Sequence, residues 1–566
     1  MNSRSAMPPA LRRLAASARQ AAGQGLNALR AVRPAARRTE RENARLRKHG
    51  IALLDRLSRS HTPSSYRRVL VDGMWDNPNY WTRYALLRGA LGLAGAEEHG
   101  LLGAWNRKRV TASFEGLGIA TLRDFRIRPA DRRRQMARAR AMAAGIASAD
   151  DAMALSWPED FPAEIAYDAI IRRQRRGDVD PSDPMLADHI AEGLACIAAA
   201  GALLDDAGYD LLVLSHAINF DFGALAWCAQ RRGIDVVIAY GNYGSNRFLR
   251  IDGPDALDDF SNVPDRARFD GVGAAAMTLL REKGRALMAD RLGGATDDIG
   301  AVYAFQKTTG GLERARVVTE LGLDPDKPVI CVYASNWFDF PHGAPMVHFR
   351  DFRDWIDATL AVAARTPQVN WLFRPHPCDT WYGAVNGPTL ADLVAATAAP
   401  HVHLVPATWN GAELMGAIDG GITYFGTVAV ELATAGKPAL LADRGWYGHL
   451  GFARLPASRE DYLSLLASDW WRDMDLADCR ARAEAFAGWW FAMPDWLAPI
   501  RLRDDSNQET IWQTLTAWLG ADGAALEVEI ATIAAWMQSG ERHLNVYRWS
   551  RALPDGDMAQ VKRTAS

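Results

Sequence analysis

The chain has 566 residues, of which 49% are hydrophobic and 23% charged, and its formal net charge is −2. This length is too great for one hydrophobic core and predicts two or three domains. The balanced charge argues against a protein devoted to nucleic acid. Five cysteines without a CxxC pair argue against a disulfide framework or a zinc site and favour a reducing compartment.

Residues 1–60 are rich in arginine and alanine and predict a basic, helical arm. A basic amphipathic segment can lie on an anionic membrane surface, and a solvated arm is the alternative. The sequence shows neither an apolar run of about 20 residues nor the pattern of a signal peptide. We therefore expect a cytoplasmic protein, with peripheral contact to the inner face of the cytoplasmic membrane if the arm binds lipid.

Residues 61–325 predict a Rossmann-like lobe with a helical insertion. A short buried strand at 68–72 opens this lobe, and a second βαβ unit runs from a strand at 211–214 to a strand at 236–240. The segment that follows, 240–244, contains two glycines that allow close backbone approach, and we expect it to line the acceptor side of a site.

Residues 326–455 have the most regular pattern and predict a second Rossmann-like lobe. Short apolar strands alternate with helices here, which indicates a parallel sheet covered on both faces. Ligands of such sheets bind at the carboxyl ends of the strands. Residues 456–566 are helical and rich in tryptophan, and we expect them to pack on the two lobes.

Two loops at carboxyl ends of predicted strands carry side chains suited to phosphate. The first loop contains Asn336, and the second reads Arg374-Pro375-His376-Pro377. The two prolines stiffen the second loop, so that Arg374 and His376 project from a rigid turn. Guanidinium and imidazole groups donate hydrogen bonds to phosphate oxygens.

A third loop, with Gly426 and Thr427, runs directly into a predicted helix. A small-residue turn at a helix start presents backbone N–H groups to an anion. One turn later, Glu431 is placed to accept hydrogen bonds from ribose hydroxyls. Each loop alone is typical of an ordinary turn or helix cap, but three such loops at one edge of one sheet predict a nucleotide site.

The catalytic base is expected from the first lobe, on loops that follow its strands. The candidates, in order of preference, are His216, Asp221, Asp72 and Asp76. An imidazole or carboxylate at these places could accept the proton of an acceptor hydroxyl, or a carboxylate could attack the anomeric carbon if configuration is retained. A role in structuring the loop is the alternative for each, and Asp76 in particular precedes a turn sequence.

No metal site is predicted. Three DxD strings, at 178–180, 324–326 and 473–475, do not follow buried strands and are attributed to chance. Arg374, His376 and the helix start could stabilise a leaving phosphate without a metal ion.

The motif of the second lobe resembles that of a known group of enzymes. A strand followed by Arg-Pro-His-Pro, and about fifty residues later a strand followed by Tyr-Phe-Gly-Thr-x-x-x-Glu, is similar to the capsule and surface-polysaccharide biosynthesis transferases. The bacterial β-Kdo transferases are most similar, and the CDP-glycerol glycerophosphotransferases and bacterial sialyltransferases more distantly so. The resemblance covers residues 328–445 and, weakly, 209–250. A single hydroxyl at Thr427 replaces the Ser-Ser pair of several relatives, and the acidic motif of the Kdo enzymes is not found.

The resemblance implies a GT-B fold, with two Rossmann-like lobes whose parallel sheets face a cleft. It implies that His376 contacts the donor phosphate, that Thr427 stands for the Ser/Thr of the family motif and that Glu431 holds the nucleotide sugar. The implied activity is metal-independent transfer of a sugar from a CMP- or CDP-type donor to a saccharide or lipid-linked acceptor, with no cofactor. The alternatives are a polyol-phosphate transferase or sugar-nucleotide epimerase of the same fold, and a non-catalytic scaffold of a polysaccharide assembly complex.

Overall fold

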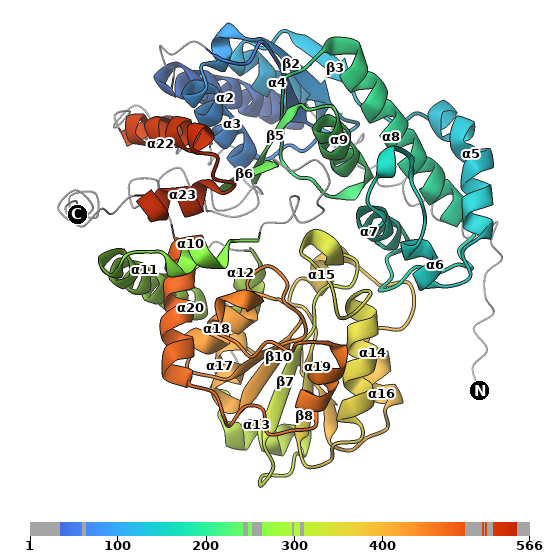
Figure 1. The fold of residues 1–566 in the computed structure, drawn as a ribbon, viewed down its shortest axis with the longest axis vertical. Helices are drawn as coiled ribbons and strands as arrows, with labels where there is room; N and C mark the ends of the chain where they lie inside the picture. Colours follow the sequence, from blue (N-terminus) through green and yellow to red (C-terminus); the bar gives the residue numbers. More distant parts are fainter. Residues whose placement is uncertain are drawn as a thin grey trace.

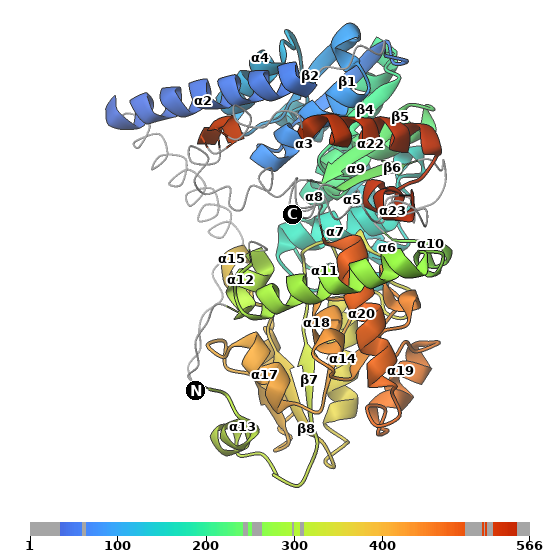
Figure 2. The same ribbon diagram turned by 90° about the vertical axis from the view of Figure 1, so that its left-hand side faces the viewer.

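Two α/β lobes lie one above the other along the long axis of the molecule (Figure 1). The computed structural model describes residues 34–58, 64–240, 247–251, 263–296, 299–305, 311–492, 512–513, 515–517 and 525–551. Each lobe has one sheet with helices on both faces, seen from a second side in Figure 2. The predicted fold class, with two Rossmann-like lobes, is therefore confirmed.

The sheet of the first lobe has six strands in the order β3-β2-β1-β4-β5-β6. Its strands are β1 (Arg68–Gly73), β2 (Glu97–Leu102), β3 (Thr121–Asp124), β4 (Leu211–Leu214), β5 (Asp235–Tyr240) and β6 (Arg247–Ile251). The first five are mutually parallel, whereas β6 pairs antiparallel with β5. No strand is predicted from the sequence at 247–251, and β6 adds an antiparallel edge to the predicted parallel sheet. All five parallel strands end at the same edge, which brings the loops after β1 and β4 together.

Helices cover both faces of this sheet. They are α2 (Pro34–Ser58), α3 (Pro78–Ala90), α4 (Arg107–Leu117), α5 (Pro129–Ala144), α6 (Ala149–Met153), α7 (Ala163–Gln174), α8 (Leu186–Ala207) and α9 (Asn219–Arg231), with 3-10 turns η1 (Leu93–Gly95) and η2 (Pro158–Asp160). Among the described helices α8 alone is long and apolar enough to span a membrane, but 56% of its apolar window is buried in the protein. Such burial is typical of a core helix.

The sheet of the second lobe has five parallel strands in the order β11-β10-β7-β8-β9. The strands are β7 (Val329–Tyr333), β8 (Asn370–Arg374), β9 (Val402–Leu404), β10 (Gly420–Thr423) and β11 (Ala439–Leu441). The helices are α10 (Arg266–Asp270), α11 (Ala274–Leu292), α12 (Ile299–Phe305), α13 (Arg314–Leu321), α14 (Phe352–Ala363), α15 (Asp379–Tyr382), α16 (Leu390–Ala396), α17 (Gly411–Ala417), α18 (Val428–Thr434), α19 (Arg459–Leu466) and α20 (Leu476–Trp490), with 3-10 turns η4 (Pro341–Gly343) and η5 (Gly448–Leu450). The strands β7, β8 and β10 lie at the centre of this sheet, so their carboxyl ends are adjacent.

Helix α11 falls in the range predicted for the first lobe, yet it packs on α20 of the second lobe. Two glycines permit the close approach of these helices. A Cβ at Gly284 would lie 1.8 Å from the Glu484 carbonyl oxygen, and one at Gly488 would lie 1.9 Å from the Leu280 carbonyl oxygen. The chain then returns to the first lobe, where α22 (Ala525–Ser539) packs on α3 and α23 (Leu544–Arg551) contacts β6.

Helix α7 of the first lobe also joins the two lobes. The Tyr167 hydroxyl donates a hydrogen bond of 2.6 Å to the Asp351 carboxylate of the second lobe. The next residue, Asp168, accepts bonds of 2.8 Å from the His342 backbone N–H and 2.7 Å from the His342 ring. All four side chains are buried, so the junction between the lobes is a closed polar contact.

The described part of the basic arm is helix α2, which packs against α3 and α4. Arg47 is only 2% exposed and forms a buried ion pair with Asp76. The described part of the predicted helical arm is thus a helix that packs on the first lobe. The first 33 residues lie outside the described residues.

Candidate functional site

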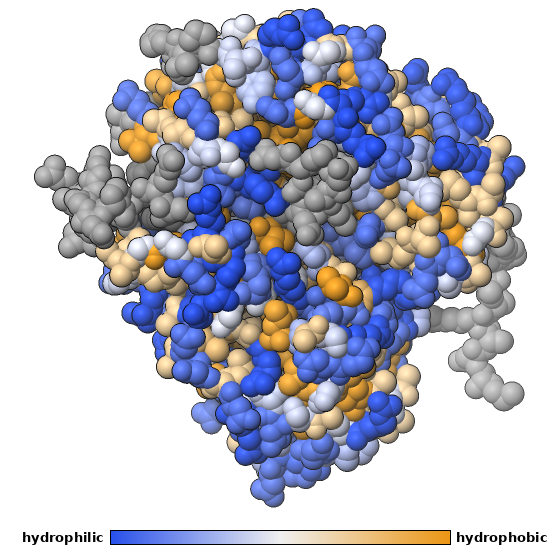
Figure 3. Space-filling model, viewed as in Figure 1, coloured by the Kyte–Doolittle hydropathy of each residue, from blue (hydrophilic) through white to orange (hydrophobic). Residues whose placement is uncertain are grey.

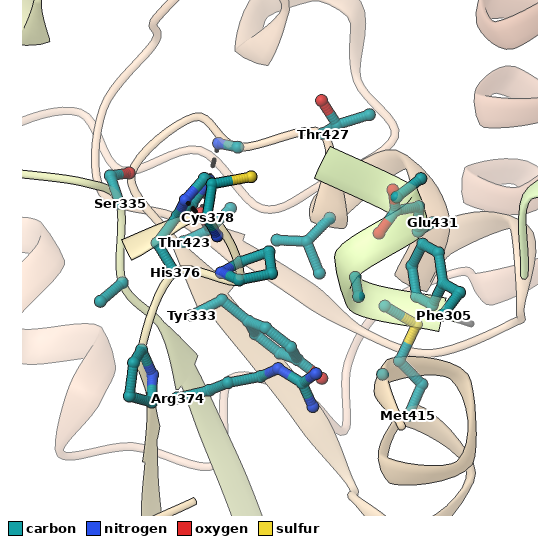
Figure 4. Close-up of a pocket in the computed structure, with 18 of the residues that line it drawn as sticks. Phe305, Tyr333, Ser335, Arg374, His376, Cys378, Met415, Thr423, Thr427 and Glu431 are labelled. Atoms are coloured by element: carbon teal, nitrogen blue, oxygen red, sulfur yellow. Dashed lines mark hydrogen bonds between the residues drawn. The ribbon is translucent and has the colours of Figure 1, made fainter. Parts of the chain in front are cut away.

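The carboxyl ends of β7, β8 and β10 open on a cavity of about 260 Å³ (Figure 4). Of the predicted donor-binding residues, five line this cavity: Arg374, His376, Gly426, Thr427 and Glu431. On the face shown in Figure 3, apolar side chains reach the surface between the lobes, while the outer parts of both lobes are mostly hydrophilic. The three loops that the sequence predicted to meet do meet at one site.

Asn336, the sixth predicted residue, is not among the residues that line the cavity. Its side-chain amide donates a 2.8 Å hydrogen bond to the Asp379 carboxylate, and its oxygen accepts one from the Phe338 backbone. Asp379 follows the Arg-Pro-His-Pro loop, and burial raises the pKa of its carboxyl to about 6. Asn336 therefore supports the loop that carries His376 instead of facing the cavity, because its amide is used to hold Asp379.

Arg374 ends strand β8 and is 7% exposed. Its Nη2 donates a 3.1 Å hydrogen bond to the Trp409 carbonyl oxygen. Its Nη1 is buried and has no hydrogen-bond partner in the described part of the chain, and no carboxylate there forms an ion pair with this guanidinium. A buried cation without a counter-charge is costly unless a ligand supplies one.

His376 stands on the stiff turn after β8. The Cys378 backbone N–H donates to its Nδ1 over 3.3 Å, so this nitrogen acts as the acceptor. In a neutral imidazole the proton then lies on Nε2. The turn thus assigns a tautomer in which Nε2 is a hydrogen-bond donor, as a phosphate oxygen requires.

Thr427 is the N-cap of α18, and Figure 4 shows it at the upper rim of the cavity. The N–H groups of Ala429 and Val430 already bond to the Gly426 and Thr427 carbonyl oxygens, at 3.1 and 3.0 Å. The expectation that the helix start offers a row of unpaired N–H groups is therefore wrong for these two, because the tight turn satisfies them internally.

Glu431, one turn along α18 from Thr427, is 4% exposed. Its Oε1 accepts a 2.6 Å hydrogen bond from Nε of Arg291, which also lines the cavity. Arg291 comes from α11 and was not singled out by the sequence. The wall therefore carries an ion pair, and the residues that line the cavity include two arginines, Arg291 and Arg374, and two carboxylates, Glu431 and Asp339.

One side of the cavity is apolar, with Phe305 of α12 and Met415 of α17 beside Glu431 (Figure 4). At its rim the Tyr382 hydroxyl donates a 2.5 Å bond to Asp339. Arg172 of α7 forms an ion pair of 2.7 Å with the same carboxylate. An apolar wall next to cationic groups suits a ligand with a flat ring and a charged tail.

In the first lobe, a hydrogen-bonded chain links three residues at the sheet edge. The Ser215 hydroxyl donates a 2.5 Å bond to the Asp72 carboxylate and lies 2.9 Å from Nδ1 of His216. Asp72 is fully buried and also accepts from the Met74 backbone N–H. Burial raises the pKa of Asp72 to about 6, against the lowering effect of these hydrogen bonds. Two of the predicted base candidates thus form one unit, with Ser215 between them.

The other two candidates have different surroundings. Asp221 lies in the first turn of α9, where burial raises the pKa of its carboxyl and the Phe222 backbone donates to it. Asp76 is held in the buried ion pair with Arg47 and also accepts from the Trp81 indole. Arg47 bonds to both carboxylate oxygens of Asp76, so this side chain is used in the fold and is the least available of the four base candidates. The segment 241–244 lies outside the described residues.

Several residues at the site had no signal in the sequence. Arg291 and Phe305 lie in helices that precede the second sheet, and only tertiary packing brings them to the cavity. Ser215 stood next to a named candidate, but the strand gave no indication that its hydroxyl turns toward β1. Among the described residues, no group of three or more His, Cys, Asp or Glu side chains is placed to hold a metal ion.

The sequence matches no family model and no curated protein. Solved structures that resemble the chain include a putative UDP-N-acetylglucosamine 2-epimerase from Listeria monocytogenes, with a TM-score of 0.28, 11% identity, and coverage of 85% of this chain and 98% of that one. The UDP-GlcNAc 2-epimerase from Neisseria meningitidis bound to UDP-GlcNAc has a TM-score of 0.24, 11% identity, and coverage of 75% and 97%. The S. aureus MnaA–UDP co-structure has a TM-score of 0.29, 11% identity, and coverage of 81% and 98%. Likenesses this weak carry no conclusion about substrate or activity.

Proposed function

We propose that the cavity binds the phosphates of a nucleotide sugar and that the protein transfers the sugar to a capsule or surface-polysaccharide acceptor. The observation that supports this most is the buried Nη1 of Arg374, which has no partner among the described residues. A phosphate would supply both the missing hydrogen-bond acceptor and the missing counter-charge. The Nε2 proton of His376 adds a second donor on the neighbouring turn.

The apolar wall of the cavity would bind the nucleoside. A pyrimidine ring packs against Phe305 and Met415, and Glu431 accepts a hydrogen bond from a ribose hydroxyl while it remains paired with Arg291. A cavity of about 260 Å³ is close to the lower bound of about 300 Å³ for ligand pockets. The sugar would therefore extend out of the cavity toward the first lobe. A CMP- or CDP-type donor is preferred, on the resemblance described above.

In the transfer, the acceptor oxygen forms a bond to the anomeric carbon while the bond from that carbon to the phosphate oxygen breaks. His216 accepts the proton of the acceptor hydroxyl, and Ser215 and Asp72 hold its ring in place. The nucleotide leaves with its negative charge, which Arg374 and His376 stabilise. A retaining reaction would instead pass through a carboxylate, for which Asp221 is the candidate.

A sugar-nucleotide epimerase is the second candidate, because the unit of Asp72, Ser215 and His216 could equally move a proton at a sugar carbon. The two reactions differ in their need for an acceptor. An epimerase introduces deuterium from D2O into the sugar without an acceptor, whereas a transferase does not. A polyol-phosphate transferase would be recognised by its product, and a scaffold by the absence of nucleotide binding.

The test is calorimetric titration of the full chain with CMP, CDP, UDP and GDP. We expect at least one nucleotide to bind, with cytidine nucleotides preferred and with affinity reduced by inorganic phosphate. The absence of binding with all four would overturn the proposal. The variant Arg365→Met, at an exposed arginine of the same lobe, is the control for Arg374→Met.

A further inference from the structure

The loop between β2 and α4 presents a tryptophan to solvent. Trp105 is 66% exposed, although a tryptophan is usually largely buried. The loop is fixed in shape: Asn106 adopts a left-handed conformation with φ of 53°, and Nη1 of Arg107 donates a 3.0 Å bond to the Gly103 carbonyl oxygen. The ring is therefore held out from the surface by a defined turn.

Basic residues flank this tryptophan in the loop after β2 and follow β3 in the neighbouring loop, and three of them are paired with acids: Arg107 and Arg126 with Asp124, and Arg128 with Asp131. We define the Trp105 surface as Trp105 together with five cations: Arg107, Lys108, Arg109, Arg126 and Arg128. Arg107 forms a 2.6 Å ion pair with Asp124, which places the loop after β2 beside the loop after β3. Lys108 and Arg109 are exposed and form no ion pair with any residue that the structure describes.

The positive charge continues along helix α5, which follows directly after Arg128. Four of its arginines are exposed, namely Arg133, Arg134, Arg138 and Arg140. The charge is spread over two loops and a helix of 16 residues, which at about 1.5 Å per residue extends for about 24 Å. So extended a field fits a broad anionic surface better than a single small anion.

We propose that the Trp105 surface docks the protein on an anionic lipid bilayer. Tryptophan favours the headgroup region of membranes, where its ring is apolar and its N–H remains hydrated. Lysine and arginine next to it gain from the negative potential of anionic lipids. A ring that stands 66% exposed out of the surface can enter headgroups, whereas a saccharide subsite would hold it in a depression. Charge and shape therefore favour a membrane over a soluble polyanion.

The position of the Trp105 surface also bears on the proposed function. Only the link between this surface and the acceptor rests on that function. Strands β1, β2 and β4 are parallel, so the loops with Trp105 and with His216 lie at the same edge of the sheet. The loops after β1 and β2 are in contact, since a Cβ at Gly103 would lie 3.1 Å from Cα of Met74. A bilayer at the Trp105 surface would thus put a lipid-linked acceptor at the edge that carries the candidate base.

The experiment is co-sedimentation of the full chain with phosphatidylcholine vesicles, with and without about one-third phosphatidylglycerol. We expect binding to the anionic vesicles only, and weaker binding at high salt, because salt screens surface charge. The double variant K108Q/R109Q should bind roughly 25-fold more weakly, since each cation near the surface is worth about fivefold. Trp105→Ala should also weaken binding. All three side chains are exposed, so the variants keep the fold, which the unfolding midpoint verifies.

The matched control is R41Q/R45Q, which removes two exposed arginines of α2 and tests the basic arm as the membrane contact. We expect this variant to bind vesicles as the natural chain does. Equal binding to neutral and anionic vesicles, or a larger loss in R41Q/R45Q than in K108Q/R109Q, would overturn the proposal. Tight binding of dextran sulfate that is unchanged in Trp105→Ala, with no vesicle binding, would indicate a polyanion site instead. Nucleotide titration of the same variants separates failure of this proposal from failure of the proposed function.

Discussion

Asp168 of helix α7 accepts two hydrogen bonds from His342 of the second lobe, one from its backbone N–H and one from its ring. The two side chains are 3% and 4% exposed. Burial opposes the charged imidazole, but the carboxylate beside it raises the pKa of His342 overall. This pair is a specific contact between the lobes, at a place where α7 also reaches the rim of the cavity through Arg172.

The first prediction concerns this pair. His342→Ala leaves the Asp168 carboxylate buried without its partner, so the free energy of unfolding should fall by about 3–5 kcal/mol. Urea denaturation measures the loss. Arg316→Ala breaks the exposed pair with Glu320 and should cost no more than about 1 kcal/mol. An equal effect of the two substitutions would show that the Asp168 pair contributes no more than a surface ion pair.

The second prediction separates binding from stability at Arg374. Arg374→Met removes a buried cation that has no counter-charge among the described residues, so the nucleotide-free protein should be as stable as before or more so. Nucleotide affinity should nevertheless fall by about 1.5–3 kcal/mol, the value of a hydrogen bond to a charged group. Thermal unfolding and calorimetry measure the two quantities, with Arg365→Met as the control. Unchanged affinity would remove Arg374 from the phosphate site.

The sequence predicted this part of the site well because strand ends are a local property. Short apolar strands with polar loops after them are enough to place Arg374, His376 and Thr427 at one edge of the sheet. Arg291 could not be found in this way, because it reaches the cavity through the packing of α11 on α20. The burial of Arg47 cannot be found from the sequence either, since a run of basic residues gives no sign that one of them is buried against Asp76.

The third prediction distinguishes the two ends of the cavity. Glu431→Gln removes the negative charge that Arg291 faces, so the cavity becomes more positive. Inorganic pyrophosphate should then bind more tightly, while CDP should gain less or lose affinity because the carboxylate that accepts from ribose is gone. Competition calorimetry with both ligands gives the comparison. Equal gains for CDP and pyrophosphate would mean that Glu431 does not contact the nucleoside.

The fourth prediction concerns His376. His376→Ala should remove about 2–4 kcal/mol of transition-state stabilisation and so slow the transfer of the sugar. This is the usual effect of losing one hydrogen-bond donor to a developing negative charge. His376→Gln places an amide N–H donor near the position of Nε2 and should recover part of the rate. Steady-state kinetics with saturating donor is the measurement. The double variant that combines His376→Ala with Asn336→Ala shows whether Asn336 acts through the loop that carries His376. If it does, the effects of the two substitutions on the rate should not add.

The last prediction is the pH dependence that follows from Asp72. Its folded pKa of about 6 exceeds the ordinary value of 3.8, so between these values the folded protein binds more protons than the unfolded chain. The free energy of unfolding should therefore fall as pH rises from about 4 to about 6, by up to about 3 kcal/mol from this group. The rate should rise over the upper part of that range, as the carboxylate that orients His216 through Ser215 becomes charged.

Asp72→Asn tests both statements. An amide offers one acceptor oxygen where the carboxylate oxygens accept from Ser215 and Met74, so the variant should be less stable by about 1–3 kcal/mol. It should also lose the Asp72 contribution to the pH slope and the inflection in rate near pH 6. Ser215→Ala keeps the carboxylate and should retain a titration in stability while the rate falls, because the link to His216 is cut. A rate profile unchanged in both variants would leave Asp72 and Ser215 as parts of the fold alone, and the base would then have to be sought at Asp221.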